Sequence, residues 1–233
     1  MHRPSPNGQT LVELVIAIGI IVMCVVAILG LTISTSTLSN ASKAQILAVN
    51  LAREGIEVAR HIRDNNWLAI DSGVANMTWN NGLYYQDASY TYDYTGIAEY
   101  QLPTSGTWTL LFDQVSNLSS PAAQMYYHPV KGFYDQIENF DPASWSGWSK
   151  ISYWRLLHTN PICWPTGGPT LANPEKILGD TAQASAVGSD PCTMPPLTGY
   201  TQVGIQVRSQ VRWLEHGRPH TVEIDDKLFN WKP

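Results

Sequence analysis

Hydrophobic residues form one continuous run near the start of the chain. From Leu14 to Ile33, twenty consecutive residues carry no charge, which is about the length of helix that crosses a bilayer core of roughly 30 Å. One carboxylate, Glu13, stands directly before this run. The pattern predicts a membrane-spanning helix over residues 9–33. It also makes Glu13 a candidate functional residue, because a carboxylate at the edge of lipid is costly unless a cation meets it.

After this run the apolar positions narrow to a single stripe. They recur at spacings of three and four, as on one face of a helix: Ala44, Leu47, Leu51, Gly55, Val58 and Ile62. Opposite charges such as Arg53 and Glu57 stand four residues apart on the other side, a spacing that supports helices. The pattern predicts an amphipathic continuation over residues 34–66 that ends near Asn65-Asn66. The whole helix would be about 85 Å long.

Beyond Trp67 the pattern changes to short strand signals separated by turns. Strands are predicted over residues 107–115, 123–128 and 149–157, and a loop rich in proline and glycine over about 160–196. The clearest signal is a hairpin, with Val203, Ile205, Val207, Val211 and Trp213 on one side and a turn at residues 215–218. We therefore expect an α+β fold, in which the stripe of the long N-terminal helix packs on an antiparallel sheet in a β-rich region over 67–233.

Composition narrows the possible functions. The chain has 233 residues and a net charge of −5, and the part beyond Ile33 is also acidic. This balance argues against nucleic acid as a partner, since phosphate binding requires a basic surface. The motifs HExxH, GxSxG, GxGxxG and the P-loop do not occur in the sequence, and no His or Cys has metal-ligand spacing. We therefore predict no enzyme activity, cofactor or metal.

Two kinds of residue remain as candidate site residues. Cys163 and Cys192 form the natural disulfide pair if this region lies outside the cytoplasm; the alternative is two unpaired buried thiols. Trp145, Trp148 and Trp164 lie in loop-like stretches and could form a carbohydrate-binding platform. The alternative for the aromatic residues is packing within the sheet, where they are favoured.

The N-terminal residues resemble a known processing signal. Gly8, followed by Thr10-Leu11-Val12-Glu13-Leu14, resembles the class III signal of type IV pilins and pseudopilins. The resemblance implies that residues 1–8 are a leader, that prepilin peptidase cuts between Gly8 and Gln9, and that Gln9 becomes N-methylated. Glu13 then matches the family's glutamate at the fifth position of the mature chain, which pairs with a neighbouring subunit. The family usually has phenylalanine or methionine where this chain has Gln9.

The resemblance implies a structural function. The chain would be a minor pilin or pseudopilin of a type IV pilus or a type II secretion-like filament, serving pilus assembly, adhesion, motility, DNA uptake or secretion. Its partners would be prepilin peptidase, other pilin subunits and the membrane. It would span the cytoplasmic membrane once, with the β-rich region outside, and would become part of an extracellular filament after assembly.

Three alternatives stay open at this point. The apolar run could belong to a secretory signal peptide cut near Ser39-Asn40-Ala41, or it could be an ordinary single-pass anchor. The third alternative is a membrane-anchored module that binds carbohydrate for adhesion and never polymerises. Such a module would keep its leader, so the state of the N-terminus separates it from a pilin.

Overall fold

The computed structural model describes residues 11–86, 91–101, 106–112, 117–138, 140–179, 181–183, 190–193, 197 and 199–231. A single long helix, α1, covers Leu11–Asp71. The chain divides into two compact units, residues 1–44 and residues 45–233, and α1 contributes to both. We call the first the apolar unit and the second the head unit, and describe each by itself.

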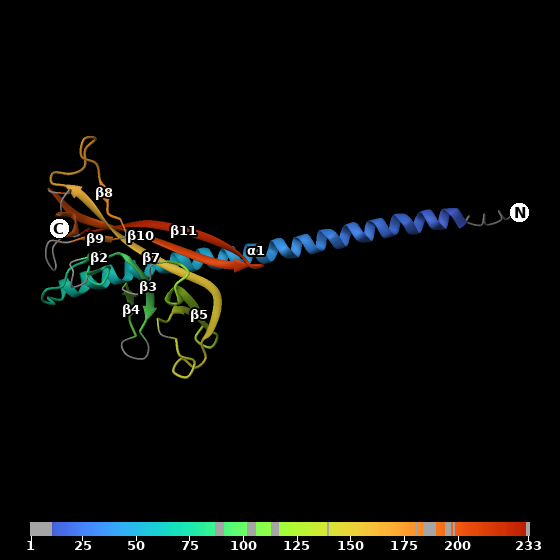
Figure 1. Ribbon diagram of the computed structural model, residues 1–233, viewed down its shortest axis with the longest axis horizontal. Helices are drawn as coiled ribbons and strands as arrows, with labels where there is room; N and C mark the ends of the chain where they lie inside the picture. The colour runs from blue at the N-terminus through green and yellow to red at the C-terminus, as the bar shows by residue number, and fades with distance from the viewer. Residues whose placement is uncertain are drawn as a thin grey trace, which may run out of the picture. The chain divides into compact units, whose positions relative to one another are not determined.

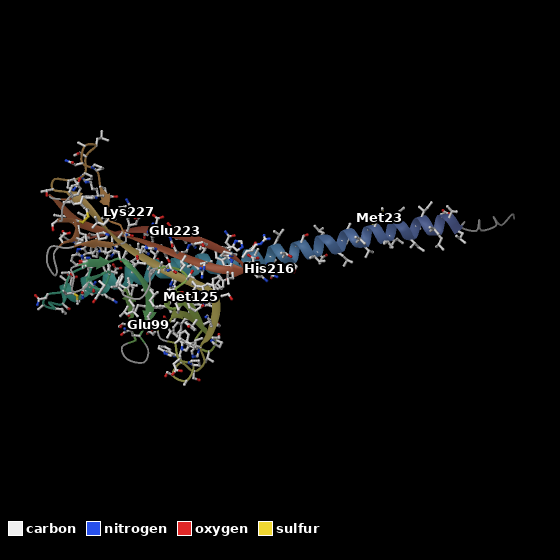
Figure 2. All side chains as sticks on the ribbon, in the orientation of Figure 1. Met23, Glu99, Met125, His216, Glu223 and Lys227 are labelled. Atoms are coloured by element: carbon white, nitrogen blue, oxygen red, sulfur yellow. A yellow bond between two sulfur atoms is a disulfide. The ribbon has the colours of Figure 1, made fainter. Side chains whose placement is uncertain are left out.

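The apolar unit presents hydrophobic side chains around the helix. None of the residues in its most apolar stretch is buried, and side chains such as Met23 project outward from the ribbon (Figure 2). Hydroxyl groups further along bond back to carbonyls four residues earlier, as Thr32 Oγ1 does to the Ile28 oxygen at 2.8 Å. This bonding lets Ser and Thr residues remain helical. By length and composition α1 could cross a membrane, as predicted for residues 9–33.

The head unit is built on antiparallel strands. Its strands are β1 Tyr85–Gln86, β2 Thr91–Asp93, β3 Thr95–Tyr100, β4 Trp108–Leu111, β5 Gln124–His128, β6 Phe133–Gln136, β7 Ser149–Pro165, β8 Lys176–Ile177, β9 Thr181–Gln183, β10 Tyr200–Glu215 and β11 Arg218–Phe229. Two short 3₁₀ helices are η1 Pro121–Ala123 and η2 Pro191–Thr193. The larger sheet has the order β11-β10-β7-β3-β4, with β5 and β8 also pairing with β7 and β6 with β5. A smaller sheet has the order β1-β2-β9.

The C-terminal hairpin confirms the predicted alternation. β10 and β11 pair from Glu215↔Arg218 down to Gly204↔Phe229, and the two turn residues have positive φ, 49° at His216 and 76° at Gly217. Such a two-residue turn matches the twist of the strands. Side chains from Ile205 to Trp213 alternate between buried and half-buried, but Val203 departs from the pattern. It lies at a register shift between Gln202 and Gly204, which interrupts the alternation.

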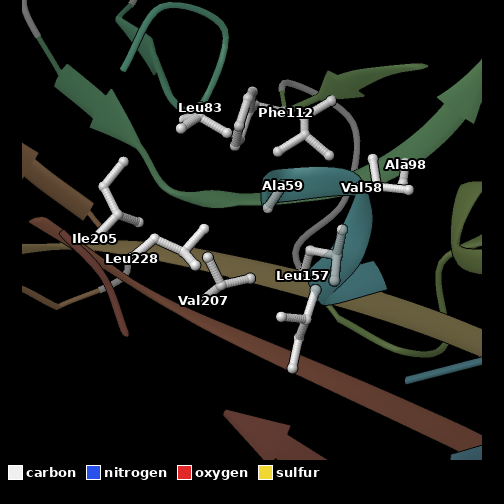
Figure 3. Packing of buried hydrophobic residues seen from close by; sticks show 11 residues of the cluster. Val58, Ala59, Leu83, Ala98, Phe112, Leu157, Ile205, Val207 and Leu228 are labelled. Carbon is white, nitrogen blue, oxygen red and sulfur yellow. The ribbon is translucent and has the colours of Figure 1, made fainter. Parts of the chain in front are cut away.

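The second half of α1 packs on the larger sheet, as the stripe predicted. β7, β10 and β11 run alongside this part of the helix (Figure 1). The core cluster joins the helix to five strands and includes Val58, Ala59, Leu83, Ala98, Phe112, Leu157, Ile205, Val207 and Leu228 (Figure 3). Gly55 permits the close approach, since a Cβ there would lie 2.7 Å from Leu157 Cδ2 and 2.8 Å from Ser209 Oγ.

Two predicted boundaries were wrong. α1 continues to Asp71 rather than ending at Asn65-Asn66, because the Asn66 amide does not cap the helix. Its Nδ2 instead donates to the carbonyls of Trp79 and Asn81, at 3.1 and 2.7 Å. Likewise β7 does not stop at Leu157, and the predicted loop at 160–196 begins with strand. The residues from Arg155 to Cys163 are all buried between neighbouring strands, so this segment lacks the alternation that signals a strand.

The two cysteines of the head unit are joined. Cys163 at the end of β7 and Cys192 in η2 form a disulfide with a Cα–Cα distance of 5.5 Å. Both are fully buried beside Leu197 and Tyr200. Closing a loop of 29 residues contributes about 3–4 kcal/mol of stability in the chain-entropy view. Cys24, in the apolar unit, is a free and exposed cysteine.

Candidate functional site

The residues predicted for processing and assembly lie at the start of the chain. Gly8 and Gln9 fall outside the described residues. Glu13 lies in the first turn of α1 as described, and it is the acidic residue of that turn. A negative side chain at this end of a helix interacts favourably with the helix dipole. Its side chain is exposed in the single chain.

The three tryptophans of the predicted platform do not form one surface. Trp145 and Trp148 meet edge to face with ring centroids 6.2 Å apart, and Trp148 also packs edge-on against Phe133 at 5.1 Å. Trp164 lies in β7 instead of a loop, and its indole N–H donates to Glu175 at 3.0 Å. Trp145 and Trp148 therefore meet in one cluster, whereas Trp164 has other partners, Glu175 and Phe229.

A different group of aromatic residues lines a groove of the head unit. One part of the groove, of about 340 Å³, is lined by Glu54, Tyr100, Trp108, Phe133 and Tyr134. An adjoining part, of about 430 Å³, shares Glu54, Tyr100 and Trp108 and adds side chains of α1 that include Glu57 and His61. We call both parts together the aromatic groove. It lies where α1 meets β3, β4 and β6.

Local strand pairing positions the rings of the aromatic groove. Tyr100 and Trp108 are cross-strand partners at the ends of β3 and β4, and their ring centroids are 5.2 Å apart at an interplanar angle of 55°. Phe133 begins β6 and meets Tyr100 edge to face at 5.9 Å and 83°. Trp108 and Phe133 therefore both stand at steep angles to Tyr100, and the three rings line a corner of the groove.

A buried polar network lies beneath this groove. Arg155 of β7 is fully buried, and its guanidinium donates to the Leu51 carbonyl of α1 at 3.2 Å and to Gln136 Oε1 at 3.0 Å. It also pairs with Glu54 Oε1 at 3.3 Å. Gln136 in turn accepts from the Ala98 amide at 3.2 Å. One arginine thus ties α1 to β3 and β6, and it orients the carboxylate that lines the groove.

The neighbouring carboxyl group of Asp135 has a strongly shifted pKa. The residue is fully buried, and this burial raises its pKa from 3.8 to about 7. Hydrogen bonds from the amides of Tyr100 and Gln136, at 2.9 and 2.8 Å, and the charge of Arg155 act in the opposite direction. Both amides bond to Oδ1, and Oδ2 has no hydrogen-bond partner within the described part of the chain. Because this pKa is about 7, the protonated and ionised forms of Asp135 are similarly populated at neutral pH.

Asp135→Asn is expected to stabilise the protein at alkaline pH. Because the pKa is raised on folding, the folded state binds the proton more tightly, and stability falls as the pH rises from about 4 to 7. Asparagine keeps an acceptor for the two amides and never ionises. At pH 8 the variant should gain on the order of 1–3 kcal/mol over the wild type, and at pH 4 the gain should be near zero.

The measurement is the free energy of unfolding by denaturant at several pH values between 4 and 8. Asp225→Asn, at an exposed position of β11, is the matched control and should show no such window. A difference between Asp135→Asn and the wild type that does not change with pH would contradict the assigned ionisation.

Sequence reasoning missed the aromatic groove and the network. The sequence pattern does not single out Tyr100, Trp108 or Phe133, because their meeting depends on the pairing of β3 with β4 and on the position of β6. A signal for Arg155 was present in the sequence, since it is a lone charge within the strand-like stretch Ile151–Thr159. Among the described residues, no group of three or more His, Cys, Asp or Glu could hold a metal ion.

No protein-family model matches the chain, and comparisons with curated proteins and with solved structures found no match.

Proposed function

We propose that the chain is a filament subunit, a minor pilin or pseudopilin of a type IV pilus or a type II secretion-like filament. The observation that carries the proposal is the unbroken helix α1. It joins an exposed apolar segment, headed by Glu13, to a stripe that packs on an antiparallel sheet. On assembly, a filament subunit leaves the lipid and packs its apolar segment against equally apolar helices of its neighbours. It therefore needs the apolar segment and the stripe that packs on the sheet within one helix. The resemblance of Gly8 and Thr10–Leu14 to the class III signal supports the same function.

The proposed assembly step depends on charge. Cleavage after Gly8 creates an α-amine on Gln9, four residues from Glu13. In a bundle of apolar helices, the amine of one subunit and the Glu13 carboxylate of another each need a partner, because an unpaired charge in such surroundings is expensive. Their pairing sets the axial position of each subunit. The apolar unit then serves as membrane anchor before assembly and as filament core after it.

Gly8→Leu is expected to block processing, because the branched side chain stands next to the bond that prepilin peptidase must cut. Mass spectrometry of the native N-terminus is the measurement. The wild type should begin at Gln9 with one added methyl group, and the variant should retain residues 1–8. Gly19→Leu is a matched control within the apolar helix, where a Cβ meets nothing within 4 Å, and should be processed normally. A wild-type mature chain that still begins at Met1 would remove the proposal.

The aromatic groove of the head unit favours a second candidate, a membrane-anchored adhesion module that does not polymerise. Half-buried aromatic side chains around a concave surface are typical of ligand sites. This candidate predicts an uncleaved leader, and the same N-terminal measurement therefore decides between the two. Both candidates use α1 as a membrane anchor at some stage.

A further inference from the structure

The walls of the aromatic groove combine aromatic rings with carboxylates. Tyr100, Trp108 and Phe133 present ring faces at angles of 55° and 83° to their neighbours, so they bound a corner instead of a flat shelf. Glu54 borders both parts of the groove, and its side chain is one-third exposed. A ligand in the corner therefore meets aromatic rings on several sides and a carboxylate on another.

The charged side chains that line the aromatic groove are carboxylates. Glu54 and Glu57 both line the groove, and no lysine or arginine is among the described residues that line either part. The basic partner of Glu54 is Arg155, which is fully buried behind it, and Glu57 pairs with Arg60 on the helix surface. Both carboxylates are thus held in place by cations outside the groove. His61 also lines the groove.

These features select one class of ligand. A phosphate or carboxylate ligand would face Glu54 and Glu57 without a compensating cation in the walls. A neutral sugar ring could stack on one aromatic face, but it carries no charge that would pair with Glu54 and Glu57. A compact organic cation gains from every ring face within about 6 Å and from the nearby carboxylate, and angled aromatic cages are the known means of binding such groups.

We propose that the aromatic groove binds an organic ammonium ion, at the corner formed by Tyr100, Trp108 and Phe133 beside Glu54. The chemistry is that of a trimethylammonium or alkylammonium group on a short apolar stem. Such a group is supplied by a small molecule or by a lysine side chain of another protein. The site lies wholly within the head unit, so it does not depend on whether the chain assembles into a filament.

The test uses the full chain in a polyoxyethylene detergent, because maltoside and phosphocholine detergents would themselves compete. Isothermal titration calorimetry follows the binding of four probes: choline, its uncharged isostere 3,3-dimethyl-1-butanol, Nα-acetyl-lysine amide and methyl α-glucoside. Choline should bind at least about tenfold more tightly than the isostere, which has the same shape without the charge. Its affinity should also fall as salt is added. Comparing choline with the lysine derivative separates the two sources of the cation, a small molecule and a lysine side chain. Binding of either cation that is tighter than binding of the uncharged isostere supports the site.

Variants place the binding in the groove. Trp108→Leu should weaken choline binding at least about fivefold, because leucine keeps an apolar surface but removes the π face. Trp145→Leu, at a partly buried tryptophan that does not line the groove, should leave the affinity unchanged. Thermal unfolding of each variant checks the fold, and Trp108→Phe, which keeps an aromatic face, replaces Trp108→Leu if the latter unfolds.

Three results would overturn the proposal. The isostere could bind as tightly as choline, which would make the site merely apolar. The glucoside could bind while neither cation does, which would assign the groove to carbohydrate. Finally, Trp145→Leu could weaken choline binding as much as Trp108→Leu, which would place the cation elsewhere.

Discussion

Arg155→Met is expected to lower the free energy of unfolding by about 3–5 kcal/mol, the cost typical of breaking a buried charged pair. The guanidinium is fully buried and joins the Leu51 carbonyl, Gln136 and Glu54. Methionine fills part of the volume but donates no hydrogen bond. The contact between α1 and the strands beneath the aromatic groove would therefore lose its polar connections.

The loss should also depend on pH. The charge of Arg155 holds the pKa of Asp135 lower than burial alone would. Without Arg155, an ionised Asp135 loses the cation that offsets its burial, whereas a protonated Asp135 does not need one. Arg155→Met should therefore be less destabilised relative to the wild type at pH 4 than at pH 8.

Denaturant unfolding of the full chain in detergent measures both effects. Arg218→Met is the matched control, because Arg218 is exposed at the start of β11, and such surface substitutions usually change stability by no more than about 0.5 kcal/mol. If Arg155→Met stays within about 1 kcal/mol of the wild type at both pH values, the network does not hold the helix to the sheet.

Glu13→Ala is expected to abolish incorporation into filaments while leaving the protein in the membrane. Removing a charge from the edge of an apolar helix makes insertion easier. Cleavage at Gly8 should persist, because the peptidase acts at the leader junction. Assembly should fail, because the Gln9 amine of the neighbouring subunit would lack its partner inside an apolar bundle. This prediction rests on the proposed filament function.

The measurement compares sheared surface filaments with the membrane fraction in cells that produce the wild type or the variant. Glu57→Ala is the control, since Glu57 lies on the same helix but beyond the apolar run and pairs with Arg60 at the surface, where an ion pair contributes little. Normal amounts of Glu13→Ala in filaments would remove the function assigned to Glu13. Loss of the variant from the membrane would instead indicate failed insertion.

The parts of the fold that sequence predicted share a property. The apolar run from Leu14 is continuous over twenty residues, and the stripe through Leu51 and Val58 and the alternation from Ile205 to Trp213 are periodic over nine or more residues. Periodicity of that length reports which face of an element is buried. It therefore predicted the long helix, its packing face, the C-terminal hairpin and the α+β class.

Other parts of the fold were not predicted, because complete burial of a strand removes the alternation of polar and apolar residues. Arg155 to Cys163 are buried on both sides of β7, and a strand covered on both faces shows no alternation. Prolines at 161 and 165 made the same segment look like a loop. The side chain of Asn66 indicated a helix stop, yet it bonds to backbone groups of residues 79 and 81, which no local pattern encodes.

The sequence by itself determined the elements whose reason is local: the apolar length of α1, the position of Glu13 before it, and the hairpin turn at His216-Gly217. Tertiary structure decided what depends on residues far apart in the chain. Three contacts depend on how the strands pair in the folded sheet. They are the pairing of Tyr100 with Trp108, the contact of Phe133 with Tyr100, and the burial of Arg155 against α1. The sequence pattern therefore did not predict the candidate site, because only the fold brings its residues next to one another.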